Sequence, residues 1–287
     1  SGGFHAQAEV DQFNQTRLVI GIDDYDFSWK LKKGESFSTP EVCLTYSADG
    51  FSKLSQTLHQ AIVSNLIRSC WKDRVRPILV NNWEATYFDF NKDNLIAIAK
   101  EAAELNLDML VLDDGWFGKR DDDFSGLGDW FVNEKKLCGT LSELVKEVHD
   151  MGLSFGLWFE PEMISEDSDL YRAHPDWALV IPGRQPIRSR SQLVLDMSRE
   201  DVTDYLTERI CDIVEKADIQ YIKWLFFDTF CNFCHQIRLT SKNLHGNRML
   251  HRIDLHKRDC IFIMKRNRLC TDHLCAQQTC PLLLAEN

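Results

Sequence analysis

The stretch Leu110-Val-Leu-Asp-Asp-Gly-Trp116 decides the fold of this chain. Three apolar residues run directly into two adjacent carboxylates, which a glycine and a tryptophan follow. Three comparable apolar runs also end in polar or aromatic residues, at residues 77–83, 154–160 and 221–224. A parallel α/β protein places its functional site in this way, at the carboxyl ends of its strands.

The composition bounds the classes of protein to which the chain can belong. Its 287 residues are enough for one large or two medium domains, and 44% hydrophobic with 27% charged residues is typical of a globular protein. The formal net charge of -11 argues against nucleic acid as a partner, and no apolar run approaches the roughly 20 residues of a membrane span. The chain has no initiator Met, and residues 1–5 are not a signal peptide, so we expect the chain to begin inside a longer protein.

Charge and residue types are unevenly distributed along the chain. Residues 1–224 carry 24 Lys and Arg against 39 Asp and Glu, whereas residues 225–287 carry 9 against 5. The last 63 residues also hold 6 of the 10 Cys and 5 of the 9 His, while all eight Trp lie before them. We interpret this change as two segments of different origin, joined near residue 224.

The first 76 residues predict a β-rich segment followed by a helical linker. Residues 17–21, 27–31 and 41–46 are β-rich runs separated by turn signals, so we expect 1–50 to be the end of an antiparallel β domain. Apolar residues recur at helical spacing over 52–70, which predicts a helical linker at 51–76.

From residue 77 onward the hydrophobic period alternates between strand and helix. Asn91 and the capping box Thr140-Leu-Ser-Glu143 begin two helices, and Ser198–Asp201 is a capping signal for a third. Short connections between strands and helices predict right-handed βαβ units and a parallel sheet. The pattern indicates four strands up to Trp224, and residues 192–197 are compatible with a short extra strand.

Asp113 and Asp114 are the first candidate site residues. They end the strand at a point where Gly115 turns the backbone, so both carboxylates are expected to reach the mouth of the sheet. Paired carboxylates there suit either a metal ion or the vicinal hydroxyls of a sugar. The alternative is a solvated turn, because Asp-Asp-Gly is ordinary turn sequence.

Three tryptophans favour a sugar. Trp83, Trp116 and Trp158 each follow a predicted strand, so all three are expected at one mouth. The C–H face of a sugar packs on an aromatic plane, while its hydroxyls need carboxylate acceptors and cationic donors. A single tryptophan is more often a packing residue, but three at equivalent strand ends beside two aspartates favour a carbohydrate pocket.

Further charged residues follow the same strand ends. Glu160-Pro-Glu162 adds two carboxylates, or alternatively makes a rigid turn. Lys223 lies in the last strand and needs a partner if its ammonium is buried, for which Asp113, Asp114 or a bound hydroxyl is suitable. Arg190 is the second candidate cation and is equally compatible with a surface charge in an Arg-Ser-Arg loop.

Four motifs follow one another along this part of the chain: Asn81-Asn-Trp-Glu-Ala-Thr-Tyr-Phe88, Leu112-Asp-Asp-Gly-Trp-Phe117, Gly156-Leu-Trp-Phe-Glu-Pro-Glu-Met163 and Tyr221-Ile-Lys-Trp224. They resemble the signatures of microbial α-galactosidases of glycoside hydrolase family 36. The likeness runs from about residue 1 to residue 224. It implies an α/β fold in which 77–224 is the first half of a catalytic (β/α)8 TIM barrel, preceded at 1–50 by the C-terminal end of an N-terminal β-sandwich.

The resemblance also implies the substrate and the residues that hold it. Members of the family hydrolyse terminal α-galactosyl residues of short oligosaccharides with retention, and no metal or other cofactor is expected. By family habit we expect a homo-oligomer in the cytoplasm. Two aspartates are expected to hold galactose hydroxyls, with two cations and two tryptophans around the sugar: Asp113, Asp114, Arg190, Lys223, Trp158 and Trp83.

The resemblance fails at the catalytic nucleophile. Retaining enzymes use one carboxylate as nucleophile and a second carboxylic acid as acid/base, about 5–5.5 Å apart. In this family the nucleophile is the aspartate directly after a Lys-Trp pair, but here Lys223-Trp224 is followed by Leu225, and Asp228 lies three residues further on. Leucine has no lone pair to attack an anomeric carbon. We therefore expect the chain to be inactive as written, or alternatively to be a non-catalytic galactoside-binding protein.

Nothing after residue 224 resembles the family. The simplest account is a shifted reading frame or a misjoined gene at codon 225, which makes 225–287 a non-homologous tail. Two alternatives for the tail are a haem attachment motif, Cys231-Asn-Phe-Cys-His235, and a zinc site. The zinc ligands offered by the tail are Cys270, His273, Cys275 and Cys280.

The four predicted strands do not close a barrel. They leave an open sheet edge, so we expect an aggregation-prone chain.

Overall fold

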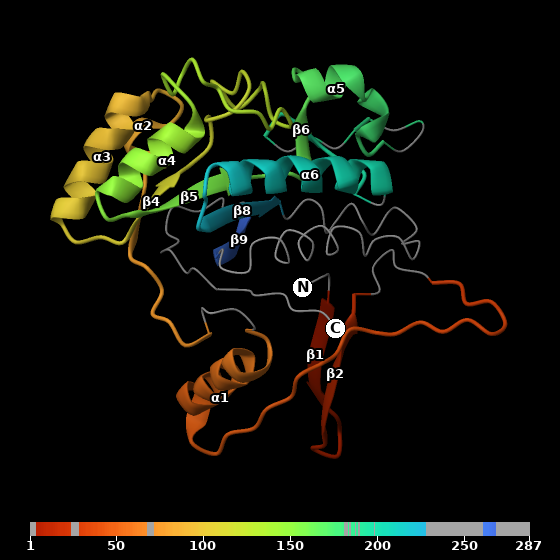
Figure 1. The fold of residues 1–287 in the computed structure, drawn as a ribbon. Coiled ribbons are helices and arrows are strands. Elements are labelled where there is room, and N and C mark those ends of the chain that lie inside the picture. Colours follow the sequence, from red (N-terminus) through yellow and green to blue (C-terminus); the bar gives the residue numbers. More distant parts are fainter. Residues whose placement is uncertain are drawn as a thin grey trace. The chain divides into compact units, whose positions relative to one another are not determined.

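The computed structural model describes residues 4–23, 29–67, 72–180, 183, 185–186, 188, 190–197, 199–227 and 261–267. These residues divide into two compact units, with the boundary between Asn65 and Leu66. The first unit contains a β-hairpin and a helix, and the second contains a parallel sheet with its helices (Figure 1).

The first unit is built around an antiparallel hairpin. Strands β1 (Phe4–Val10) and β2 (Thr16–Ile22) pair along their whole length. The Asp11 carboxylate closes the turn by accepting hydrogen bonds from two backbone N–H groups. Helix α1 (Gly50–Asn65) has no buried residue.

Only part of the predicted β-structure forms in this unit. The strand predicted at 17–21 is present as β2, but residues 29–31 and 41–46 hold no strand. The prediction also missed β1. The helix predicted over 52–70 is present as α1, although it ends at Asn65. A β-rich run forms a strand only when another strand pairs with it. The local sequence pattern does not show whether such a partner strand is present.

The second unit contains a five-stranded parallel sheet, in the order β3-β4-β5-β8-β9. All four pairs of neighbours run parallel. The four parallel strands predicted up to Trp224 are present as β3, β4, β5 and β8, and β9, from beyond that residue, adds to the edge of β8. The strand predicted at 221–224 also extends three residues further. The bounds are β3 (Leu79–Asn81), β4 (Met109–Leu112), β5 (Ser154–Phe159), β8 (Tyr221–Phe227) and β9 (Ile261–Asn267).

Three helices connect these strands. Helices α3 (Lys92–Glu104) and α4 (Leu141–Asp150) pack against each other and against β4 and β5 (Figure 1). Both begin with the predicted caps, since Asn91 and Thr140 each form a reciprocal capping box. Helix α6 (Glu200–Lys216) begins differently from the prediction. Its N-cap is Arg199, which makes no side-chain capping bond.

Smaller elements lie between β5 and α6. Strands β6 (Met163–Ser165) and β7 (Gln192–Val194) form an antiparallel pair, so the short strand considered at 192–197 is present outside the parallel sheet. Helix α5 (Asp169–Ala173) and the 3-10 helix η2 (Pro175–Trp177) complete the segment. Helix α2 (Trp83–Thr86) directly follows β3.

One face of the sheet is layered by residues in register. Asn81, Val111, Gly156 and Tyr221 occupy equivalent positions on β3, β4, β5 and β8. Because side chains alternate along a strand, residues two positions further on project from the same face. Trp158 and Lys223 are such residues and pair in register, so the polar groups at the strand ends lie above an apolar layer.

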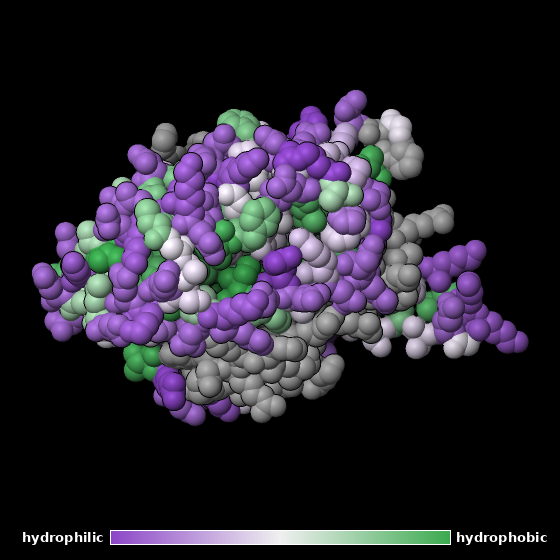
Figure 2. Space-filling model, turned by 45° about the horizontal axis from the view of Figure 1, so that its top comes forward, coloured by the Kyte–Doolittle hydropathy of each residue, from purple (hydrophilic) through white to green (hydrophobic). Residues whose placement is uncertain are grey.

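The surface combines polar and apolar areas. Hydrophilic residues cover most of one face, and hydrophobic residues gather near its middle (Figure 2). Among the helices of the described segments, none has the length and apolar character needed to cross a membrane.

Candidate active site

Asp113 is the centre of the first polar cluster. It follows β4 directly and is almost completely buried. Its Oδ2 accepts hydrogen bonds from Asn81 Nδ2, at 2.6 Å, and from the Lys223 ammonium. The backbone N–H of Asp113 donates to Asn82 Oδ1 at 2.8 Å. Lys223 therefore has a carboxylate partner in the folded chain, and that partner is Asp113.

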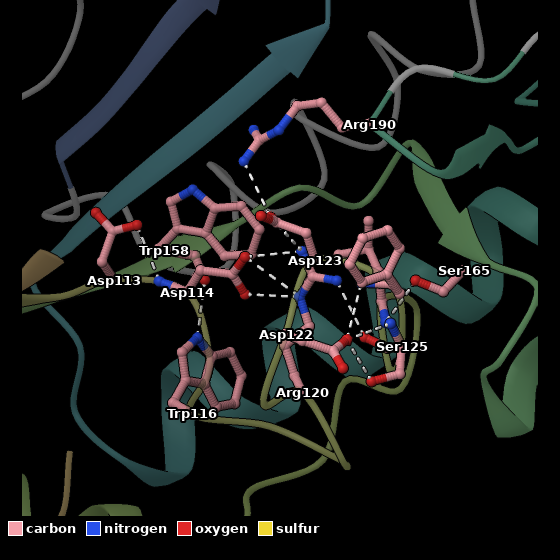
Figure 3. Close-up of polar contacts among 12 residues, drawn as sticks. Asp113, Asp114, Trp116, Arg120, Asp122, Asp123, Ser125, Trp158, Ser165 and Arg190 are labelled. Atoms are coloured by element: carbon pink, nitrogen blue, oxygen red, sulfur yellow. Dashed lines mark hydrogen bonds and ion pairs between the residues drawn. The ribbon is translucent and has the colours of Figure 1, made fainter. Parts of the chain in front are cut away.

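Asp114 is bound by a buried arginine. Arg120 Nε lies 3.1 Å from Asp114 Oδ1, and another guanidinium nitrogen lies 2.9 Å from Oδ2. Arg120 is 0% exposed and also donates to the Ser125 carbonyl oxygen, at 3.0 Å. Burial raises the pKa of Asp114, while the Arg120 charge opposes this shift. The bidentate pair fixes the orientation of the carboxylate (Figure 3).

Arg190 reaches the same region from the segment before β7. Its guanidinium donates to Asp123 Oδ1 at 3.2 Å. The same Asp123 oxygen lies 3.9 Å from the Arg120 guanidinium, so Asp123 stands between the two arginines (Figure 3). Asp114, Arg120, Asp123 and Arg190 thus form a chain of alternating charge, and we name these four residues the charge chain.

The tryptophans do not all lie at the mouth of the sheet. Trp158 is 3% exposed and stacks on Phe117, with ring centroids 6.2 Å apart and planes within 9°. The prediction for Trp116 was wrong: it is completely buried, and its indole N–H donates to the Trp158 carbonyl oxygen at 3.0 Å. The backbone turns at Gly115, and the Trp116 ring packs in a cluster with Phe117, Trp130 and Phe159. Trp83 is half-buried and packs edge-to-face with Phe88.

Two glutamates after β5 are buried. Neither carboxylate oxygen of Glu160 has a hydrogen-bond partner among the described residues, and burial together with the Asp114 charge raises its pKa well above the usual range. Glu162 Oε1 accepts from Trp224 Nε1 at 2.8 Å. Burial raises the pKa of Glu162 to about 7.

Leu225 follows Trp224 in the middle of β8. It is 6% exposed and two residues beyond Lys223, so it projects from the same face of the strand. An aliphatic side chain therefore occupies the position beyond the Lys-Trp pair. Asp228 lies outside the described residues.

The described residues contain no group of three or more His, Cys, Asp and Glu side chains arranged to hold a metal ion. Asp113 and Asp114 instead take lysine and arginine partners. The haem motif at 231–235 and the four proposed zinc ligands at 270–280 lie outside the described part of the chain.

The structure adds four residues to the predicted set. Asn81 is the last residue of β3 and Asn82 follows it, so their signal was a strand-end position like that of Asp113. Arg120 and Asp123 lie in the polar run 118–125, which has the composition of an ordinary surface loop. The buried Arg120 side chain contacts Asp114, the Ser125 carbonyl oxygen and the ring of Phe88, and the sequence of the loop does not show these contacts.

Comparison with known proteins identifies the family of the chain. A sequence model of the melibiase family matches residues 36–253, and the chain is similar to several curated α-galactosidases. The chain belongs to this family of glycoside hydrolases, the α-galactosidases of family 36.

Two curated relatives illustrate the likeness. The bifunctional α-galactosidase/sucrose kinase AgaSK of Mediterraneibacter gnavus is 56% identical over 224 residues, which are 78% of this chain and 24% of the relative. The α-galactosidase AgaA of Geobacillus stearothermophilus is 55% identical over 224 residues, or 78% of this chain and 31% of the relative. The chain thus spans about a quarter to a third of the length of these relatives.

Solved structures of the same two proteins match the fold. The galactosidase domain of AgaSK superimposes with a TM-score of 0.84 at 48% identity, covering 92% of this chain and 37% of that one. AgaA of G. stearothermophilus matches with a TM-score of 0.84 at 46% identity, covering 92% and 38%.

Proposed function

We propose that the chain carries the galactose-recognising part of an α-galactosidase catalytic domain. In this proposal 77–224 is the first half of a (β/α)8 barrel, 51–76 is a linker, and 1–50 is the C-terminal end of an N-terminal β-sandwich. The parallel order of β3, β4, β5 and β8 supports the barrel, since sequential parallel strands with helical crossovers are its repeating unit. The antiparallel β1–β2 hairpin supports the sandwich.

One observation carries the functional proposal. Two carboxylates with fixed orientation, Asp113 and Asp114, lie at the carboxyl end of β4, and each is held by a cation. Carboxylates oriented in this way accept hydrogen bonds from neighbouring sugar hydroxyls. Lys223 and Arg190 offer donors to the same sugar, while Trp158 and Trp83 offer aromatic surface.

The proposed substrate is the terminal α-galactosyl residue of a short oligosaccharide. Variants of AgaA have been solved in complex with stachyose and with raffinose, which supports this class of ligand. A complete enzyme of this type would act with retention. This chain as written is proposed to be inactive, because Leu225 occupies the position of the nucleophile and cannot form a glycosyl–enzyme bond.

The segment 225–287 is proposed to be a non-homologous tail that arose from a shifted reading frame or a misjoined gene. The 224-residue length of the alignments with both curated relatives supports this account, whereas the melibiase match continues to residue 253 and counts against a join at codon 225. Sequencing the source DNA across codons 220–235 tests it. A one- or two-base correction that turns Leu225 into Asp and opens a longer frame is the expected result, and an unchanged frame would overturn the proposal.

A second candidate function is galactoside binding without catalysis. The observation in its favour is that the carboxylates and cations of the site are in place while the nucleophile position is aliphatic. In that case Leu225 is an evolved feature and the DNA sequence stands as written.

A binding experiment and a turnover experiment together test the proposed function. We expect galactose to bind in calorimetric titration, glucose to bind more weakly, and p-nitrophenyl α-galactoside to be hydrolysed no faster than in buffer. Asp114→Asn should abolish galactose binding. Hydrolysis by the unmodified chain would contradict the proposed role of Leu225, and failure to bind galactose would contradict the site.

Assembly and location are proposed by family likeness alone. We infer a homo-oligomeric, cytoplasmic protein with neither nucleic acid nor membrane as a partner and with no cofactor. Light scattering of the purified protein and fractionation of the source cells test these proposals.

A further inference from the structure

The charge chain connects the strand end to a residue of a distant segment. Asp114 and Arg120 are buried and form its inner half, while Asp123 and Arg190 are partly exposed and form its outer half. Figure 3 shows the Arg190 guanidinium directed at Asp123, with Arg120 on the other side of that carboxylate. Asp123 therefore links Arg190 to the part of the site that holds Asp114.

The inner half of the charge chain is rigid. Arg120 is held by Asp114 and by the Ser125 carbonyl oxygen, and its backbone packs closely against Gly126. A Cβ atom added at Gly126 would lie 2.8 Å from the Arg120 backbone nitrogen. The Gly126 N–H also donates to the Asp167 carbonyl oxygen at 2.8 Å, which ties the loop to the next segment. These contacts hold the loop that carries Asp123 in one position.

Asp123 differs from Asp121 and Asp122 in the groups that its carboxylate contacts. Asp122 accepts from the Phe124 and Ser125 backbone N–H groups and from the Ser125 hydroxyl, so it closes the loop on itself. Asp121 pairs with Lys136 at 2.8 Å. Of the three consecutive aspartates, Asp123 is the one that faces both Arg120 and Arg190.

The backbone and side chain of Arg190 both favour a residue that holds its guanidinium in place. It and Ser191 both have positive φ, at 49° and 64°, a region that residues other than glycine rarely occupy. A long arginine side chain on an exposed segment also has many rotamers, and fixing them when a ligand binds costs affinity. A carboxylate that holds the guanidinium beforehand reduces this cost.

We infer that Asp123 is a positioning residue for the galactoside site: by holding the Arg190 guanidinium against the buried Arg120–Asp114 pair, it keeps Arg190 directed at a sugar bound by Asp113 and Asp114. This inference rests on the proposed function of the site. It assigns to Asp123 no contact with the sugar itself.

The test compares Asp123→Asn with the matched variant Asp121→Asn, which removes the same charge two residues away. We expect Asp123→Asn to weaken galactose binding about tenfold without lowering the unfolding midpoint, because an exposed ion pair adds little stability. Asp121→Asn should bind like the unmodified chain, and Asp123→Glu should recover most of the loss. Equal galactose affinity in Asp123→Asn and Asp121→Asn would overturn the inference.

A double-mutant cycle separates positioning from a general structural effect. If Asp123 acts through Arg190, adding Asp123→Asn to Arg190→Ala should cause no further loss of affinity. Additive losses would overturn the inference.

A second readout does not depend on galactose. Trypsin cleaves after arginine, and Arg190 should be a better substrate once Asp123 no longer holds it. We expect Asp123→Asn to increase the cleavage rate of the Arg190–Ser191 bond several-fold over Asp121→Asn, and equal rates would overturn the inference. If the unmodified chain fails to bind galactose, the proposed function fails, and the cleavage rates still decide whether Asp123 anchors Arg190.

Discussion

Asp114 and Arg120 form a buried ion pair near the strand ends. Both side chains are almost fully withdrawn from water, so each depends on the other for the hydrogen bonds that solvent would otherwise supply. Removing one partner leaves an unpaired charge in the interior. The cost of this is much larger than the net contribution of the intact pair.

We therefore predict that Arg120→Met destabilises the protein by about 3 kcal/mol. Urea unfolding followed by tryptophan fluorescence measures the change. Arg172→Met is the matched control, because Arg172 is half-exposed in its pairs with Asp167 and Asp169 and should have little measurable effect. Equal destabilisation by the two variants would show that the burial of Arg120 does not matter.

Glu162 makes stability depend on pH. Burial raises the pKa of Glu162 from 4.5 to about 7. Between these two pH values the carboxyl group is protonated in the folded chain and ionised in the unfolded chain. A folded state that binds more protons loses stability as pH rises. The contribution of protonated Glu162 to the free energy of unfolding is therefore fully present below about pH 4.5 and is lost once the pH exceeds about 7.

Glu162→Gln should remove this dependence. Its amide oxygen keeps the acceptor for Trp224 Nε1 but does not ionise. Relative to the variant, the unmodified chain should lose about 3 kcal/mol of unfolding free energy between pH 4.5 and 7.5. Urea titrations at both pH values measure the difference, with the exposed Glu208→Gln as a charge-removal control. Parallel pH profiles for Glu162→Gln and the unmodified chain would contradict the prediction.

At the scale of the elements, close packing between strands depends on Gly156. This residue lies in register between Val111 on β4 and Tyr221 on β8. A Cβ atom there would lie 2.6 Å from Tyr221 Cδ1 and 3.0 Å from Val111 Cγ2. The ring of Tyr221 occupies the space that the missing side chain leaves, in the layer directly below Lys223.

Gly156→Ala should therefore force β5 and β8 apart and destabilise the second unit by about 1–3 kcal/mol. It should also weaken galactose binding, because Trp158 and Lys223 project from the same two strands. Gly21→Ala is the control, since nothing lies within 4 Å of a Cβ atom at that position in β2. A Gly156→Ala variant as stable as Gly21→Ala would disprove the steric argument.

The helix starts were predictable because capping is local. Each capping box joins residues three apart, so Asn91 and Thr140 carry the signal for α3 and α4 in their own sequence. The start of α6 was predicted less well. Arg199 is its N-cap, and Arg199 is bound instead to Asp176 and Asp201, the first of which comes from a separate segment.

At the scale of the whole molecule, the first unit exposes much apolar surface. Leu18 is 61% exposed, and Phe4, Val19 and Ile20 on the same hairpin are also exposed. A two-stranded sheet with apolar residues facing water and unpaired edges associates readily with other chains. In the second unit β9 covers the edge of β8, so the open edge expected after four strands lies one strand further on.

We predict that the purified chain self-associates into particles of broad size distribution, and that Leu18→Lys increases the monomer fraction. A charge in the middle of the hairpin opposes strand-to-strand association. Size-exclusion chromatography with light scattering measures the distribution, and Gln15→Lys in the hairpin turn controls for added charge. A monodisperse monomer with a sharp, cooperative melt would contradict the prediction.

The sequence by itself determined the features that depend on short spacing or on the ends of strands. These include the alternation of β3, β4, β5 and β8 with helices, the helix caps at Asn91 and Thr140, and the position of Asp113, Asp114 and Lys223 on one edge of the sheet. Carboxyl ends of parallel strands meet by geometry, so residues far apart in sequence are brought together without further information. The family motifs lie on those same ends.

Only the tertiary structure decided which groups pair there and which are buried. The partner of Lys223 is Asp113, Arg120 is an interior residue, and Trp116 is a core residue, although all three stand in sequence contexts compatible with other roles. The physical reason is that burial and ion pairing depend on how loops fold back over the strands. The loop at residues 118–126 contacts Asp129 through Gly118 and Asp167 through Gly126, and no local pattern encodes those contacts.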